Sequence, residues 1–195
     1  LHTGNGDVTI GEFSSVMRGS VAQGVDGLDI KAGAAGEEGK GNINIGTSQV
    51  AITNATMTAD GNITFGETAG ASEVLEVRGL DNDMRKVIIK AKGDIVFNQT
   101  VEIHPGEGAH RSGDVSISAG GEMHFLGEKT TIQNGGTGNS ATTTIQVGGP
   151  VEFKNVNGTE IGSGVMFRTT GDESDVAITT NGVAQINLIA GTVDS

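Results

Sequence analysis

The feature that most constrains this chain is an eleven-residue pattern of two short alternating segments joined at a glycine. It reads "VSISAGGEMHF" over residues 115–125 and returns as "VIIKAKGDIVF", "TTIQVGGPVEF", "VAITTNGVAQI" and, more loosely, "ATMTADGNITF". The copies are 28 to 33 residues apart when aligned on Gly61, Gly93, Gly121, Gly149 and Gly182. Two weaker starts lie upstream, at Gly6 and Gly41. Repeats of this length are typical of stacked architectures, because one short unit cannot bury its own apolar face.

The register around each glycine predicts two strands. Residues two and four positions after it are apolar in every unit: Val8/Ile10, Ile43/Ile45, Ile63/Phe65, Ile95/Phe97, Met123/Phe125, Val151/Phe153 and Ala184/Ile186. The residue between them is polar except at Val96, as expected for a strand with one buried face. Four residues before the five aligned glycines stand Met57, Ile89, Ile117, Ile145 and Ile178. We therefore expect the glycine to mark a corner where a side chain would obstruct the bend.

A third short strand fits between successive units, at Thr100–Ile103, Thr130–Ile132 and Thr159–Ile161. No apolar stripe with helical spacing persists along the chain. The sequence therefore predicts an all-β parallel solenoid of about six coils, formed by residues 1–195 as one domain or as a segment of a longer one. A β-sandwich of the jelly-roll type is the alternative. Only the solenoid explains the four corresponding phenylalanines, which it would stack as an internal core ladder: Phe65, Phe97, Phe125 and Phe153.

Composition excludes several kinds of partner. The formal net charge is −12, and the 12 basic residues are scattered, which argues against a nucleic-acid partner. The chain has no cysteine, so disulfides cannot stabilise it. No apolar run approaches the roughly 20 residues that span a bilayer, so we expect no membrane insertion.

Runs such as "VSISAGGEMHF" and "GDIVFNQTVEI" resemble the repeats of filamentous-haemagglutinin-like bacterial exoproteins. The resemblance covers the chain from about Gly41 to Ala190. It implies a right-handed β-helix that is exported to the cell surface and acts as an adhesin stalk or fibre.

Candidate sites are few. Asp81, Asp83, Asp172 and Asp175 offer carboxylates for calcium, the one candidate cofactor, although such residues also mark ordinary turns. His104, Glu107 and His110 form a zinc-like ligand set on a Gly-rich loop, for which an exposed polar loop is the simpler interpretation. His124 is expected to be solvated. No carboxylate pair falls on adjacent coils of the outward row after each glycine, so no catalytic residue is predicted.

The last strands are apolar almost to residue 195, and no capping helix or charged plug is evident. We therefore expect Ile186 and Leu188 to mediate end-to-end association of copies. The predicted function is an extracellular structural or adhesive fibre protein that is secreted or held at the cell surface. One alternative is an adhesin module that binds a glycan or a surface protein. The other is a polysaccharide-active β-helix enzyme.

Overall fold

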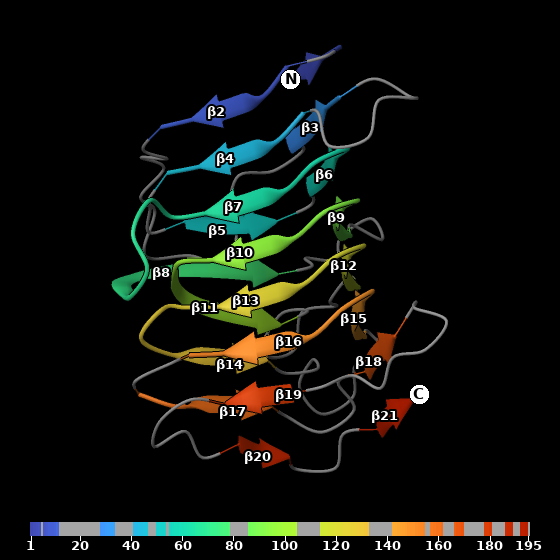
Figure 1. Ribbon diagram of the computed structural model, residues 1–195. Coiled ribbons are helices and arrows are strands. Elements are labelled where there is room, and N and C mark those ends of the chain that lie inside the picture. The colour runs from blue at the N-terminus through green and yellow to red at the C-terminus, as the bar shows by residue number, and fades with distance from the viewer. Residues whose placement is uncertain are drawn as a thin grey trace.

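The computed structural model is a stack of short parallel strands, with no helix among the residues that it describes (Figure 1). The structure describes residues 1–4, 6–11, 28–33, 41–46, 50–53, 55–78, 86–104, 114–132, 142–154, 157–161, 166–169, 178–180, 186–188 and 192–194. The strands form three parallel sheets, and successive strands of the chain pass from sheet A to sheet B to sheet C.

Sheet A has eight strands, in stacking order β1 (His2–Thr3), β3 (Leu28–Ala32), β6 (Ala55–Ala59), β9 (Val87–Ala91), β12 (Val115–Ala119), β15 (Thr143–Val147), β18 (Met166–Thr169) and β21 (Thr192–Asp194). Sheet B has seven: β2 (Val8–Ile10), β4 (Ile43–Ile45), β7 (Ile63–Phe65), β10 (Ile95–Phe97), β13 (Met123–Phe125), β16 (Val151–Phe153) and β19 (Ile178–Thr180). Sheet C has six: β5 (Val50–Thr53), β8 (Ala71–Arg78), β11 (Gln99–His104), β14 (Thr130–Ile132), β17 (Thr159–Ile161) and β20 (Ile186–Leu188).

The predicted parallel β-solenoid is confirmed. Each strand of a sheet pairs in parallel with the equivalent strand of the next coil, as β10 does with β13, whereas a jelly roll is antiparallel. Along Figure 1 the chain runs leftward in sheet B at the front and rightward in sheet C behind it while it moves down the stack, which is a right-handed winding. The coil number differs from the prediction of six, since sheets A and B contain eight and seven strands.

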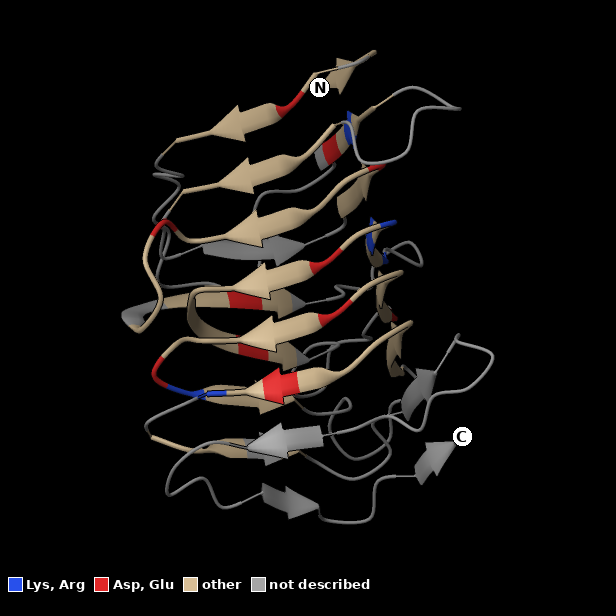
Figure 2. Ribbon diagram, in the orientation of Figure 1, with Lys and Arg blue, Asp and Glu red and all other residues tan. Residues whose placement is uncertain are grey.

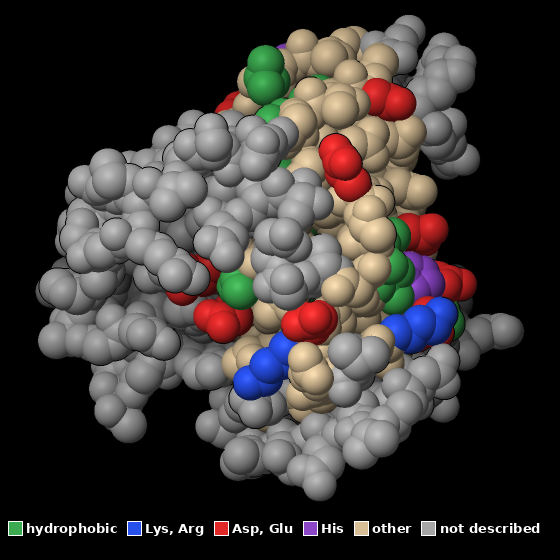
Figure 3. Space-filling model, turned by 90° about the vertical axis from the view of Figure 1, so that its left-hand side faces the viewer, with side chains coloured by type: hydrophobic (Ala, Val, Ile, Leu, Met, Phe, Trp, Pro, Cys, Tyr) green, Lys and Arg blue, Asp and Glu red, His purple; other side chains and the backbone are tan. Residues whose placement is uncertain are grey.

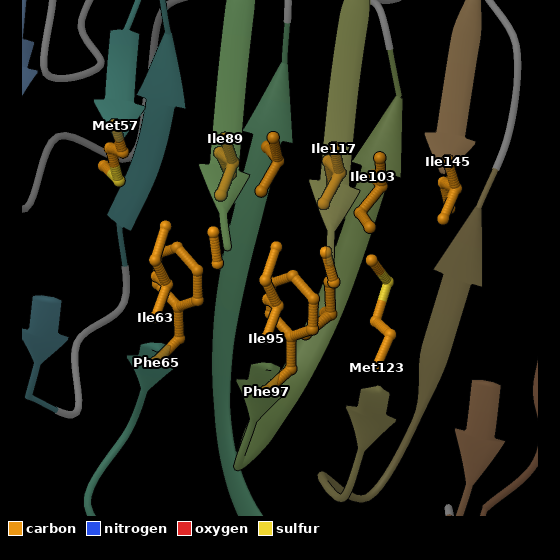
Figure 4. Packing of buried hydrophobic residues seen from close by; sticks show 14 of the residues in the cluster. Met57, Ile63, Phe65, Ile89, Ile95, Phe97, Ile103, Ile117, Met123 and Ile145 are labelled. Atoms are coloured by element: carbon orange, nitrogen blue, oxygen red, sulfur yellow. The ribbon is translucent and has the colours of Figure 1, made fainter. Parts of the chain in front are cut away.

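Alternating side chains fill the interior, as the sequence pattern predicts. Inward residues of β9, β12 and β15 place Ile89, Ile117 and Ile145 in one buried column (Figure 4). In sheet B the four phenylalanine rings stack face to face, with centroids 5.1, 4.9 and 4.7 Å apart and planes within 8° of parallel. All four side chains are fully buried.

The sequence register misplaces the last unit. Ile178 was expected in the sheet that contains Ile145, but β19 pairs with β16 in sheet B, and Ile186 belongs to sheet C. The place beside Ile145 is taken by Phe167 of β18. Apolar alternation has the same period in all three sheets, so the pattern alone cannot assign a short strand to one of them.

Side-chain oxygens connect the coils at the corner between sheets A and B. The residue after the corner glycine is Asp7, Asn42, Asn62 or Asp94, and its Oδ1 accepts the backbone N–H of the equivalent residue one coil further on. The four N···O distances are 2.7 to 2.8 Å. We call this series the corner ladder. It fixes the register of successive coils without using a sheet hydrogen bond.

The corner ladder also explains the repeated glycine. A Cβ added to Gly61, Gly93 or Gly121 would overlap the Oδ1 of the preceding coil, from Asn42, Asn62 and Asp94 respectively. None of these glycines has a positive φ. The expected obstruction is therefore real, but it comes from the neighbouring coil and not from the bend itself.

Thr130 of β14 provides a test of the interior. Its buried hydroxyl has no hydrogen-bond partner, and its neighbour in β11 is Val101. Thr130→Val should raise the free energy of unfolding by about 1 kcal/mol, because it removes an unsatisfied polar group at nearly constant volume. Thermal unfolding would measure the change, and Val101→Thr is the matched reverse substitution, expected to destabilise. A lower melting temperature for Thr130→Val would contradict the assignment.

Candidate functional site

A charged cluster lies on the outer face of sheet B, across β13 and β16. His124 Nε2 is 3.1 Å from Glu122 Oε2, and His124 Nδ1 is 3.0 Å from Glu152 Oε2. Lys154 Nζ is 2.9 Å from Glu152 Oε1. The His124 side chain is only 22% exposed, so the expectation of a solvated histidine is wrong. Figure 3 shows histidine, acidic and basic side chains gathered at the right-hand side of that view.

The cluster lies where the corner ladder ends. Glu122 follows the corner glycine in its coil, and the equivalent residue of the next coil is Pro150, which has no N–H to donate. The Glu122 side chain contacts His124 instead. A Cβ on Gly149 would lie 3.2 Å from Gly121 O, without the overlap found at the earlier corners. Ionic contacts thus replace the ladder bond at this junction.

The chemistry of the cluster is that of a connection between coils. Both ring nitrogens of His124 face carboxylate oxygens, which only accept hydrogen bonds, and only the imidazolium form carries donors on both nitrogens. The hydrogen bond from Lys154, followed by that from His124, lowers the pKa of Glu152 below its usual 4.5. Across the described ranges, no group of three or more His, Asp or Glu side chains is placed to hold a metal ion.

Acid should remove the contribution of Glu152 to stability. Because its pKa is depressed in the folded state, the stabilisation is fully present above the usual value of 4.5 and is lost as pH falls through the folded-state pKa. Glu152→Gln should therefore lower the melting temperature at pH 7 and make little difference near pH 3. Lys154→Met, which removes the main cause of the shift, should show the same pattern to a smaller extent. An equal effect of Glu152→Gln at both pH values would contradict this prediction.

A similar connection lies where the chain enters sheet A. Asp114 Oδ1 accepts the backbone N–H of Thr142 at 3.0 Å, and Lys86 Nζ is 3.2 Å from Asp114 Oδ2. Burial raises the pKa of Asp114, but the hydrogen bonds from Thr142 and Lys86 together lower it more. Three successive coils are thus joined at this edge, which gives Asp114 a structural role.

Sheet C carries carboxylates that the sequence interpretation missed. Glu102 of β11 lies directly opposite Glu76 of β8, and both are half-buried. The sequence search for paired carboxylates used only the outward row of sheet B. The alternation in "SEVLEV", set beside "QTVEI", would have revealed the pair. The next residue of this column is Thr131, so the acidic column is interrupted after two coils.

Several predicted site residues lie outside the described part of the chain. They are the four calcium candidates, Asp81, Asp83, Asp172 and Asp175, together with Glu107 and His110. His104 ends β11. Of the two assembly candidates, Ile186 lies opposite Thr159 and Leu188 opposite Ile161, in the last strand of sheet C. Calcium binding and an assembly role for β20 stay predictions.

Comparison of the chain with family models, with curated proteins and with solved structures finds no match. None of the segments described in the structure is a helix long and apolar enough to cross a membrane. The arrangement of its own residues is therefore the basis for any functional argument.

Proposed function

We propose that this chain is a structural segment of an extracellular fibre or surface stalk, built on the β-helical rod. The observation that supports this most strongly is that the rod can be lengthened. Within the described strands, each sheet ends in strands that have a single partner: β1 and β21, β2 and β19, β5 and β20. Further coils from the same chain or from a second copy can continue such a stack without any change to its interior.

Two further observations support a fibre over a binding surface or an active site. The interior columns repeat from coil to coil, whereas the outward column of sheet B changes at every coil: Thr9, Asn44, Thr64, Val96, His124 and Glu152. What repeats is the framework of the rod. The resemblance of "VSISAGGEMHF" and "GDIVFNQTVEI" to filamentous-haemagglutinin-like repeats supports a location at the cell surface, with a stalk or fibre role.

End-to-end association of copies is part of this proposal. It would pair main chain across the junction, so that a contact of two different ends continues into a filament. The purified chain should form filaments in negative-stain images and sediment as a broad distribution. Placing Lys at both Ile186 and Leu188 should abolish assembly, because it puts charge into the edge strand of sheet C. Asn187→Lys, which changes the residue between them, is the matched control and should assemble.

The same material separates the alternatives. A wild-type chain that stays a monomer at high concentration would contradict the end-to-end proposal. Specific binding of that monomer to a glycan array would favour an adhesin module. Release of oligosaccharides from a polyanionic polymer would favour a polysaccharide-active enzyme.

A further inference from the structure

The outer face of sheet A differs in charge from the rest of the rod. One outward column reads Lys31, Thr58, Lys90, Ser118 and Gln146, and the other reads Asp29, Thr56, Ile88, Ser116 and Thr144. No carboxylate occupies an outward position of β6, β9, β12 or β15, although the chain has 24 acidic and 12 basic residues. Figure 2 shows basic residues on β3 and β9 of this sheet and acidic residues along the front and back of the stack.

The cations on this face are free to meet a partner. Lys31 and Lys90 are exposed, and neither has an ion pair among the residues that the structure describes. By contrast, Lys86, Lys92 and Lys154 pair with Asp114, Asp60 and Glu152. Between the two free lysines lies Ile88, a large hydrophobic side chain that is 39% exposed. The face therefore combines positive charge, hydroxyl groups and exposed apolar surface.

Complementary charge is present on sheet C of the same chain. Its outward column continues from Glu76 and Glu102 through Thr131 to position 160, which is also a glutamate. Glu102 is half-buried and has no hydrogen bond or ion pair within the described ranges. Lys31 and Lys90 are two strands apart, and so are Glu102 and Glu160. Since neighbouring strands are about 4.8 Å apart in both sheets, the two columns share one spacing.

We infer that the outer face of sheet A packs against the outer face of sheet C of a second copy, so that rods associate side by side. The two faces differ, so the contact does not close and extends into an array of rods. This inference rests on the proposed fibre for its strength. A single exposed ion pair contributes little, and the contact becomes strong only when many coils repeat it along a filament.

Charge reversal in filaments tests the contact. Wild-type filaments should lie in side-by-side arrays at low ionic strength and separate near 1 M salt, where the Debye length is about 3 Å. Lys31→Glu with Lys90→Glu should give single filaments of normal length. Adding Glu102→Lys to that variant should restore arrays, because it restores opposite charges across the contact. Arrays that persist in the Lys31→Glu, Lys90→Glu variant would overturn the inference.

Cross-linking tests the same contact without filaments, so the inference stands or falls separately from the proposed function. The chain has no cysteine, so single thiols can be placed freely. Ser118→Cys protein mixed with Glu76→Cys protein should form more heterodimer with a short bismaleimide than Ser118→Cys mixed with Asn44→Cys, which places the thiol on sheet B. Equal yields would overturn the inference. Capture of the wild type on an immobilised polyanion, lost in the Lys31→Glu, Lys90→Glu variant while those yields are equal, would assign the face to a polyanion instead.

Discussion

Replacing Phe125 with alanine should lower the free energy of unfolding by about 3–5 kcal/mol, the largest effect expected of any single substitution here. The ring is fully buried between Phe97 and Phe153, with centroids 4.9 and 4.7 Å away. The substitution removes apolar burial and two stacking contacts. The cavity cannot collapse easily, because hydrogen bonds to β10 and β16 hold the backbone of β13 at a fixed spacing.

Chemical and thermal denaturation would measure this loss. Phe125→Leu is the graded control and should cost much less, since it keeps most of the buried volume. Val96→Ala, on the outward side of the neighbouring strand, should have a small effect. A melting temperature for Phe125→Ala equal to that of the wild type would mean that the phenylalanine ladder does not stabilise the coil.

Replacing Gly93 with alanine should cost about 1–3 kcal/mol, the second largest effect. The new Cβ would overlap Asn62 Oδ1, so the Asn62 side chain must move and give up its 2.8 Å bond to the Asp94 N–H. Gly149→Ala is the matched control. Its Cβ would lie 3.2 Å from Gly121 O, and the corner ladder has no bond there to lose. This control should be close to neutral, because the restricted unfolded chain offsets a slight crowding.

A double-mutant cycle identifies the cause. Asn62→Ala alone should also destabilise, because it removes the ladder acceptor for Asp94. In the double variant the overlapping atom is absent, so the two losses should sum to less than their separate values. Denaturant unfolding of all four proteins gives the coupling energy. Fully additive losses, or equal losses for Gly93→Ala and Gly149→Ala, would rule out the corner ladder as the reason for the glycine.

The sequence by itself determined the class of fold and most of the interior. Inward and outward residues alternate with a period of two, so the apolar columns follow once the glycines are aligned. The third strands at Thr130–Ile132 and Thr159–Ile161 were predicted with the bounds that they have in the structure. Strands β3 and β8 were missed, because neither lies in one of the aligned glycine units that defined the search.

Only the tertiary structure decided which residues meet between coils. Alternation tells which side of a strand faces inward, but the neighbour of a strand in its sheet comes from a different coil, after a loop of variable length. That is why the last unit was assigned to the wrong sheets, and why the contacts of His124 with Glu122 and Glu152 could not be anticipated. The corner ladder has the same origin. The reason for Gly93 lies in Asn62, which is one coil away in space and 31 residues away in sequence.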